Sequence, residues 1–239
     1  MIRARVAPLS RPQLIGVGVL VAHNVIVHRV LPPPADAALN VFSAVALVRF
    51  ALNDGFTRED LGLGRADLHR GTQAGLAAGV VCLGVVGLAA ALPFTRRFLV
   101  DDRFHGLGRR RTAYHVALRI PISTALTEEL LFRSVLHALF AREYSLPSTL
   151  AWTSGLFGAW HILPTLKSVE GNPAAGTSPR RMAVLVTGLA TAGAGLMFSL
   201  LRLRAKSIVA PVIAHAALNG AAFLAGRNVS ASAGLTRSL

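Results

Sequence analysis

A cluster of charged side chains interrupts a long apolar stretch of the sequence at Thr127-Glu128-Glu129-Leu130-Leu131-Phe132-Arg133. On insertion scales, a single charge at the centre of a bilayer costs roughly 2.5–3.5 kcal/mol. Three unpaired charges would therefore cost on the order of 8–10 kcal/mol. Because ionisable residues at this depth usually mark a functional site, the cluster is where chemistry is expected first.

The two adjacent glutamates of this cluster cannot do the same work, because neighbouring residues on a helix point about 100° apart. Glu129 and Arg133 stand at i and i+4, so they share a face and are predicted to form an ion pair. Glu128 has no such local partner. An isolated carboxylate in apolar surroundings is a stronger base than one in water, so Glu128 is the predicted general base.

Two later apolar runs carry further polar residues that are able to take part in catalysis. One contains Trp160-His161, and the other contains His215 and Asn219, which share one helix face at i and i+4. A single intramembrane histidine or asparagine often only bonds a neighbouring helix. The depths of these residues along their helices agree with that of Glu128 at 1.5 Å per residue. The sequence therefore predicts one polar pocket that the side chains from three helices share.

The composition favours a membrane protein. The chain is 53% hydrophobic and 15% charged, whereas soluble domains carry about 25% charged residues. The net charge of +14 would suggest nucleic acid in a soluble protein, but the arginines cluster between the apolar runs. Arginines in loops are expected to meet anionic headgroups. The expected partner is therefore the lipid bilayer, with no nucleic acid.

Seven apolar runs are long enough to be considered as spans, since a transmembrane helix needs about 17–25 residues. The predicted fold class is an all-α polytopic membrane helix bundle with about seven transmembrane helices, within a range of six to eight. The runs cover residues 14–31, 35–52, 71–92, 112–141, 148–163, 182–201 and 207–225. We expect N-terminal helices and basic loops over 1–110, a catalytic membrane core over 111–226 and a flexible tail over 227–239, all in one membrane domain.

The polar motifs also resemble the signature of a known family. Together they resemble the CPBP family, which comprises type II CAAX prenyl proteases and bacteriocin-processing or immunity relatives that are also called Abi proteins. The resemblance covers about half of the chain, from Tyr114 to Ala225, and a weaker likeness to the family's lead-in precedes the third run. The matching segments are Glu128-Glu129-xxx-Arg133, Phe157-xxx-His161, His215-xxx-Asn219 and Leu61-Gly62-Leu63-Gly64.

The resemblance implies an intramembrane endopeptidase. In that reading Glu128 activates the attacking water together with His161, while His215 and Asn219 form the oxyanion hole. Donors aimed at the position of a developing oxyanion stabilise the transition state, and two such residues on one helix face fit that role.

Two further expectations concern the residues that support the site and a bound metal ion. Glu129 and Arg133 are expected to hold the site together. A zinc ion held by Glu128, His161 and His215 is the alternative, since three such ligands leave a position open for water. The sequence has no His-Glu-x-x-His helix, so a metal-free glutamate mechanism without a cofactor is favoured.

The predicted function is hydrolysis of a peptide bond in a membrane-associated protein or peptide. The alternative is a non-enzymatic immunity or scaffold protein of the same membrane family. A proton-coupled transporter is a weaker rival, because the sequence shows no pair of discontinuous helices and no inverted repeat. The expected location is a bacterial plasma membrane, as an integral multi-pass protein.

Overall fold

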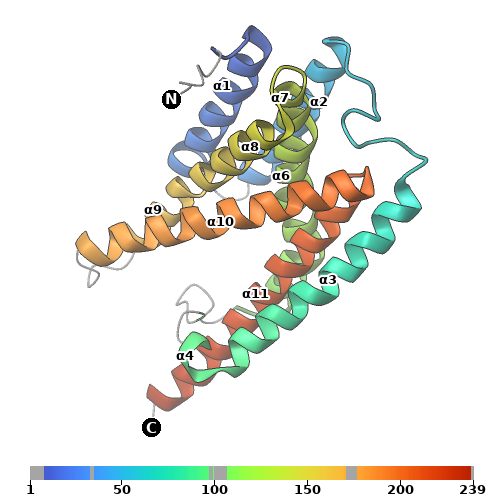
Figure 1. Cartoon of the computed structure of the whole chain (residues 1–239). Helices are drawn as coiled ribbons and strands as arrows, with labels where there is room; N and C mark the ends of the chain where they lie inside the picture. The colour runs from blue at the N-terminus through green and yellow to red at the C-terminus, as the bar shows by residue number, and fades with distance from the viewer. Residues whose placement is uncertain (1–7, 33–34, 97–98, 100–106, 171–176, 238–239) are drawn as a thin grey trace, which may run out of the picture. The chain divides into compact units, whose positions relative to one another are not determined.

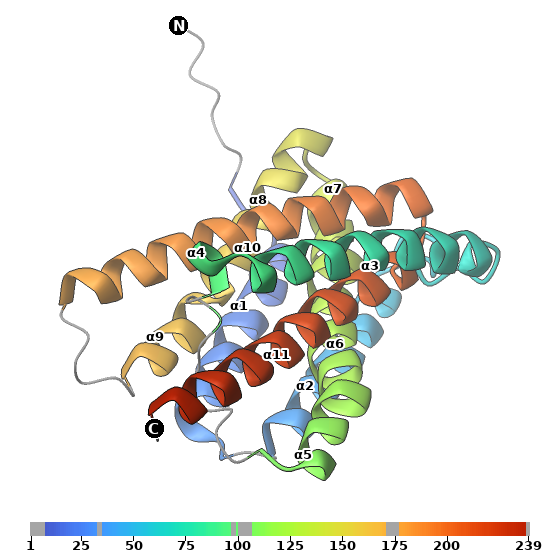
Figure 2. The ribbon, with the colours of Figure 1, turned by 90° about the horizontal axis from the view of Figure 1, so that it is seen from below.

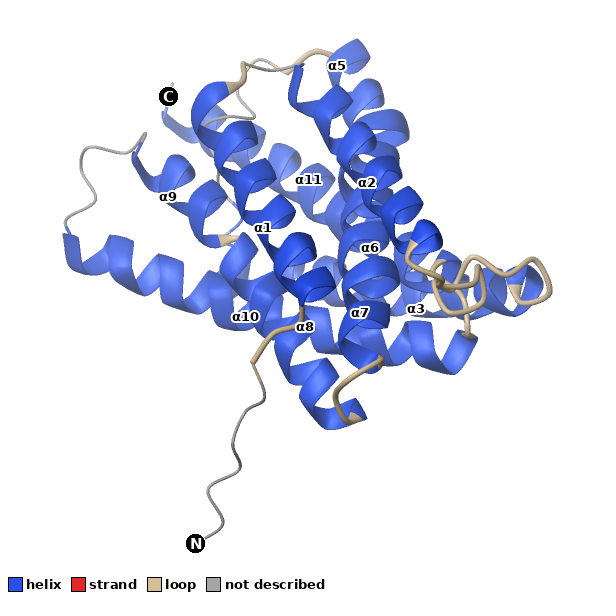
Figure 3. Cartoon of the chain, turned by 90° about the horizontal axis from the view of Figure 1, so that it is seen from above, coloured by secondary structure: helices blue, strands red, loops and turns tan. Residues whose placement is uncertain are grey.

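The computed structural model describes residues 8–32, 35–96, 99, 107–170 and 177–237 of the chain. Within these residues all the extended regular elements are helices, and the remainder is loop and turn (Figures 1 and 3). The predicted all-α fold class is confirmed.

Five helices in the described part of the chain are long and apolar enough to cross a membrane. They are Arg11–Val30, Ala35–Asn53, Leu68–Ala91, Arg180–Ala205 and Val209–Ser232. The protein is therefore an integral, multi-pass membrane protein. The other two expected runs are helical as well, but neither is among the five. One is only 15 residues long, as α8 (Leu146–Trp160), and the other carries the Glu128 cluster.

The chain forms two compact units, and each is made of two separated stretches of sequence. The first unit contains residues 1–61 and 131–197, and the second contains residues 62–130 and 198–239. The domain boundary expected near residue 110 falls inside the second unit, and that division stays a prediction.

The first unit combines the helices at the start of the chain with those that follow the Glu128 cluster. Its helices are α1 (Arg11–Val25), the π-helical η1 (Ile26–Val30), α2 (Ala35–Asn53), α7 (His137–Ala141), α8 (Leu146–Trp160), α9 (Ile162–Glu170) and α10 (Thr177–Ala205) as far as Met197. The stretch 131–140 forms its core, since every residue in it is buried. Seven of its ten residues are apolar, as burial favours.

One side chain both starts α1 and fixes it to this core. Ser10 is the N-cap of α1 and its backbone N–H donates to Gln13 Oε1 at 3.0 Å, which is half of a capping box. The amide Nε2 of Gln13 donates to the carbonyl oxygen of Leu139 at 3.2 Å. Gly16 then faces Leu139, which a Cβ at position 16 would approach to 3.0 Å. The first helix is thus held close against the core.

The second unit is organised around α3 (Leu68–Ala91) and α11 (Val209–Arg237), which lie side by side in Figures 1 and 2. Gly71, Gly75 and Gly79 stand four residues apart on α3. A Cβ at Gly75 would lie 2.9 Å from the carbonyl oxygen of Ala210. Small residues at this spacing let two membrane helices approach closely, so α11 is seated directly on the backbone of α3.

The same unit contains the short helices α4 (Pro93–Arg96) and α5 (Arg109–Tyr114), followed by the π-helical η4 (His115–Leu126) and α6 (Thr127–Glu129). The π-helical η5 (Leu130–Leu136) continues the chain, and the unit boundary falls after Leu130. The helical winding therefore changes on both sides of the two glutamates.

The turn before α11 is fixed by the segment that resembles the family's lead-in. The backbone N–H of Ile208 donates to the carbonyl oxygen of Gly62 at 3.0 Å. Gly62 has φ +68° and a Cβ there would lie 3.1 Å from Ile208. Glycine adopts that conformation without steric cost, so Gly62 sets where α11 begins.

α11 continues as a helix to Arg237, and Val229 and Ser230 are buried. Burial of these side chains supports the helix beyond residue 226. The flexible tail expected over 227–239 stays a prediction.

Candidate active site

A buried carboxylate–imidazole pair lies in the second unit. The Nδ1 atom of His215 on α11 is 2.8 Å from Oε1 of Glu129 on α6. The side chains are 4% and 0% exposed. Since an ionised carboxylate only accepts hydrogen bonds, the His215 Nδ1–H donates to Glu129. This bond commits one ring nitrogen of His215 and fixes the orientation of the other.

Glu128 faces that other nitrogen. Its Oε2 is 3.9 Å from His215 Nε2, which is too long for a hydrogen bond and is a spacing that a bridging water can span. Oε2 is buried and has no hydrogen-bond partner among the described residues. Such an oxygen is an acceptor that can hold a water against His215.

An aromatic ring holds His215 from its face. The ring of Phe198 stacks on the imidazole with centroids 5.0 Å apart and an interplanar angle of 21°. Phe198 is itself fully buried. The imidazole of His215 is therefore fixed at its edge by Glu129 and at its face by Phe198, so little freedom is left for it to lose during a reaction.

Asn219 lies one turn further along α11 than His215, as the i, i+4 spacing predicted. It is half-buried. The structure gives its side chain no hydrogen bond among the described residues, so its amide N–H groups are available to a bound group. The second unit thus brings together Glu128, Glu129, His215 and Asn219.

The winding of the chain near Glu128 is unusual. Thr127 is buried and its Oγ1 donates to the carbonyl oxygen of Ile122, five residues earlier, at 3.3 Å. Pro121 lies in η4 and has no backbone N–H to donate. Turns of π-helix are rare and occur frequently at functional sites. They set the direction in which the glutamate side chains leave the helix.

His161 belongs to the first unit, at the break between α8 and α9. Its Nδ1 donates to the carbonyl oxygen of Phe157 at 2.8 Å, and its ring meets that of Phe157 edge-on at 4.7 Å. Nε2 is then the nitrogen left for a ligand or water. The break has a local cause, because Pro164 lacks a backbone N–H and its ring would clash with the Trp160 carbonyl in a continuing helix.

Arg133 also belongs to the first unit and is almost fully buried. Its guanidinium lies over the ring of Phe157, 4.0 Å from the centroid. Gly195 on α10 leaves the space for both, since a Cβ there would lie 3.0 Å from Phe157 and 3.1 Å from Arg133 Nη2. Arg133 and His161 thus both contact the ring of Phe157.

The six residues singled out from the sequence are therefore divided between the two units. The convergence of His161 with Glu128 and the ion pair between Glu129 and Arg133 both join residues of different units, and both stay predictions. The bond between Glu129 and His215 was not expected from the sequence.

The zinc alternative requires three donor atoms around one ion. Glu128 Oε2 and His215 Nε2 are the two atoms of the second unit that could hold an ion, and His161 is the third ligand that the zinc alternative requires. Among the described residues no group of three His, Cys, Asp or Glu side chains is gathered around one point. The choice between zinc and a metal-free site stays a prediction.

The fold and the site are those of a multi-pass helical membrane protein in which a buried glutamate oxygen faces a histidine. Residues 111–221 match the family described as Type II CAAX prenyl endopeptidase Rce1-like. These residues are a little under half of the chain, and their match confirms the resemblance seen in the motifs. The match supports a protease-type hydrolase.

Comparison with curated proteins and with solved structures gives no match.

Proposed function

We propose that the protein is a CAAX-protease-like intramembrane endopeptidase of the glutamic type, which cleaves a peptide bond in a membrane-associated protein or peptide. The observation that carries the proposal is the buried Oε2 of Glu128. It has no hydrogen-bond partner among the described residues and faces His215 Nε2 across 3.9 Å. This oxygen can accept a proton from an attacking water, while His215 Nε2 can face the carbonyl oxygen of the substrate.

In the proposed reaction, Glu128 accepts a proton from the water while the water oxygen attacks the scissile carbonyl carbon. His161 is the proposed second contact of that water, through Nε2. The carbonyl oxygen becomes an oxyanion, which accepts hydrogen bonds from His215 Nε2–H and the Asn219 amide. Glu128 then gives its proton to the leaving nitrogen as the carbon–nitrogen bond breaks.

Glu129 has a defined part in this scheme. For His215 to donate from Nε2 while Nδ1–H stays bonded to Glu129, the ring must carry two protons. A buried carboxylate beside an imidazole stabilises that imidazolium. The geometry of the Glu129–His215 pair therefore supports His215 as a donor to the oxyanion.

The non-enzymatic scaffold is the less favoured function. A buried carboxylate oxygen without a hydrogen bond lowers stability, and a scaffold gains nothing from retaining it. In a hydrolase the same oxygen is held ready for the reacting water.

The test compares wild type with Glu128→Gln in purified, lipid-reconstituted protein. Glutamine keeps the shape of the side chain and removes the base. We expect peptide cleavage to be lost while the thermal unfolding midpoint is unchanged or higher. The exposed Glu143→Gln is the matched control and should cleave as wild type does. Cleavage by Glu128→Gln at the wild-type rate would exclude the mechanism.

The same variant can identify the substrate. Glu128→Gln should retain uncleaved membrane proteins, which mass spectrometry of the co-purified material would name. The metal question is answered separately by chelation. Full activity after dialysis against a strong zinc chelator is expected. Loss that zinc restores would favour the ion held by Glu128, His161 and His215.

A further inference from the structure

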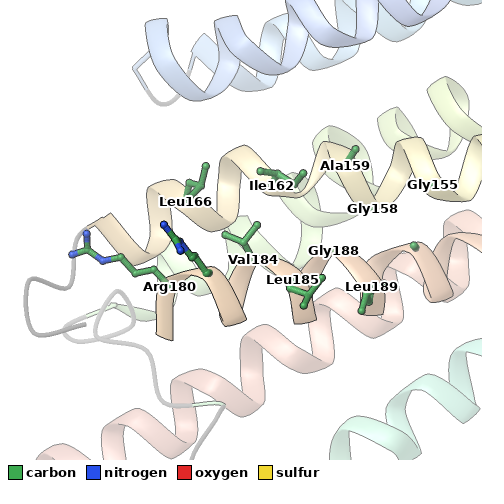
Figure 4. A pocket seen from close by; sticks show the side chains of 12 residues that line it. Gly155, Gly158, Ala159, Ile162, Leu166, Arg180, Val184, Leu185, Gly188 and Leu189 are labelled. Carbon is green, nitrogen blue, oxygen red and sulfur yellow. The ribbon is translucent and has the colours of Figure 1, made fainter. Parts of the chain in front are cut away.

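An apolar pocket of about 570 Å³ lies in the first unit, between α8–α9 on one side and α10 on the other (Figure 4). Volumes of this size are typical of sites for small ligands. The mechanism proposed above makes no use of the pocket.

The pocket arises from the way that α8 and α10 meet. A Cβ at Gly158 would lie 2.6 Å from the carbonyl oxygen of Gly188, so the two helices touch at these glycines. Side chains of α9 and of the first turns of α10 line the rest. Figure 4 shows Gly155 toward one end of the pocket and Arg180 at the other.

The lining is hydrocarbon or glycine except for two neighbouring arginines, Arg180 and Arg181. Ala159, Ile162 and Leu166 line one side, and Val184, Leu185 and Leu189 line the other. A peptide backbone placed here would bury amide groups without partners, whereas an acyl chain has no group that needs one. The lining therefore suits a lipid chain better than a peptide.

The position of the two arginines indicates which kind of lipid the pocket would bind. Arg180 is the first residue of the candidate span Arg180–Ala205, so it stands at the level where headgroups begin. Basic pockets between membrane helices bind anionic headgroups. The arginines at the end of the span match the anionic headgroup of a phospholipid. The hydrocarbon side chains along the span match its acyl chain.

We propose that this pocket binds one anionic phospholipid of the surrounding bilayer, with an acyl chain between α9 and α10 and its phosphate at Arg180 and Arg181. The site is independent of the proposed peptidase activity, since none of its contacts uses Glu128, His215 or Asn219.

Native mass spectrometry of the full chain tests the site. Protein is equilibrated with phosphatidylglycerol or with phosphatidylcholine, and bound lipid is counted. We expect one phosphatidylglycerol to be retained in preference to phosphatidylcholine. Arg180→Gln/Arg181→Gln should weaken its retention about 30-fold, the effect of two charges near an anionic surface. Arg109→Gln/Arg110→Gln, an exposed arginine pair on α5, should not.

A second variant fills the pocket without touching the charge. A Cβ at Gly155 meets nothing within 4 Å, so Gly155→Leu can be accommodated, and it should reduce phosphatidylglycerol retention. Gly87→Leu places the same side chain at an equally open position on α3 and should leave retention unchanged. Equal retention of the two lipids, or retention that neither pocket variant reduces, would overturn the proposal.

A different observation concerns Asn24 on α1, in a part of the chain that carries no family motif. The carbonyl oxygen of Trp160 would normally accept from the backbone N–H four residues later, but residue 164 is proline. The side chain of Asn24 supplies the missing donor, since its Nδ2 lies 3.0 Å from that oxygen. Asn24 therefore satisfies the carbonyl that the break before α9 exposes.

Neighbouring contacts reinforce this attachment. The ring of His23 stacks on Trp160 with centroids 5.3 Å apart and planes 14° apart. His23 Nε2 donates to Asn40 Oδ1 at 3.0 Å, and its Nδ1 lies 2.8 Å from Ser43 Oγ, whose hydroxyl donates to it. These contacts tie α1 and α2 to the residue directly before His161.

We infer that Asn24 is a positioning residue that acts on His161 through Trp160. This inference rests on the proposed function, in which His161 holds the reacting water. An error of about 1 Å in such a group can reduce the rate about 100-fold.

The experiment removes the donor and then restores it from the backbone. Asn24→Leu should lower kcat 10–100-fold with KM unchanged. Adding Pro164→Ala gives residue 164 an N–H, so Asn24→Leu/Pro164→Ala should recover most of the loss. Val21→Leu, at an exposed position of α1, is the control. An unchanged kcat in Asn24→Leu, or no recovery in the double variant, would overturn the inference.

A readout without activity separates this inference from the proposed function. In a Trp152→Phe background, Trp160 is the one tryptophan left in the chain. Its fluorescence should shift in Asn24→Leu and return in the double variant. A fluorescence change in a protein that cleaves no peptide would mean that the proposed function is wrong while the attachment is real. An unchanged fluorescence would mean that the attachment itself is wrong.

Discussion

The surroundings of His215 and His161 show two different ways of fixing an imidazole in a membrane protein. His215 is held by a charged group, Glu129, and lies within the closely packed α3–α11 unit. His161 is held by the backbone carbonyl of Phe157 at a break between two helices. Both arrangements commit the Nδ1 atom of the imidazole.

The difference has consequences for what each histidine can do. A buried carboxylate partner orients the ring through Nδ1–H and adds a negative charge beside it, which suits a donor to an oxyanion. A carbonyl partner accepts one hydrogen bond from Nδ1–H and adds no net charge, which suits an imidazole that holds a water. Substitutions that remove one partner at a time should therefore affect the two histidines differently.

The largest effect is expected from removing the charged partner of His215. Glu129→Ala should lower kcat by about 10⁴, since loss of the group that orients a catalytic histidine has an effect of that size. It should also lower the thermal unfolding midpoint, because a buried hydrogen bond is lost.

The matching measurement is steady-state kinetics on purified protein with a trapped substrate peptide, together with a thermal melt. Glu59→Ala, at an exposed position, is the control for removing a carboxylate. If Glu129→Ala kept more than a tenth of the wild-type kcat, the charged partner would not matter to His215.

Asn219→Ala should have the next largest effect, a loss of about 10²–10³ in kcat with KM nearly unchanged. The amide is expected to contact the oxyanion only in the transition state. Asn219→Asp should be worse than alanine, because a second negative charge would repel the oxyanion. A raised KM with kcat retained would instead make Asn219 a substrate-binding residue.

The close packing of α11 against α3 can be tested by measuring stability, without an activity assay. In Gly75→Ala the added methyl would lie 2.9 Å from the backbone of Ala210, which cannot move alone. We expect a loss of about 1–3 kcal/mol in the free energy of unfolding. Gly87→Ala, where nothing lies within 4 Å, should be neutral or stabilising. Denaturation in detergent measures both, and equal stabilities would show that the close approach is not needed.

The smallest effect is expected at Phe157, whose ring both Arg133 and His161 contact. Gly195→Ala would meet side chains of Phe157 and Arg133 at 3.0 and 3.1 Å, and side chains can shift by a few tenths of an ångström. The expected loss is about 1 kcal/mol. Gly193→Ala on the same helix meets open space and should not destabilise. Identical melting of the two variants would contradict the shared packing around Phe157.

Local spacing accounts for what could be predicted from the sequence. His215 and Asn219 lie on one helix, so their relation follows from helix geometry alone. The all-helical fold followed from the length and apolarity of the runs. The family match over 111–221 covers the motifs from Glu128 to Asn219.

The features of the site that could not be predicted from the sequence depend on contacts between residues far apart in the chain. Glu129 and His215 are 86 residues apart, and no periodicity relates them. The stacking of Phe198 on His215 depends equally on how two helices meet. Arg133 at i+4 was the only partner that local spacing could offer for Glu129.

Two features of the sequence indicate contacts that the polar motifs do not. Pro164 predicts the helix break at His161, because proline in a helix disrupts the bond to the residue four positions earlier. The four-residue spacing of Gly71, Gly75 and Gly79 is typical of close helix contact in membranes. The helical segment 227–237 depended on burial, which composition does not give.

The separation of α3 from α11 in the sequence has a consequence for biosynthesis. α3 ends at Ala91 and its partner begins only at Val209, so α3 is synthesised long before α11. During that interval its glycine face must be covered by lipid. With a mean hydropathy of 2.2, α3 exceeds the other four candidate spans, whereas α11 reaches 1.5. α3 can therefore insert before its partner is made, and the second unit is completed only when α11 has been translated.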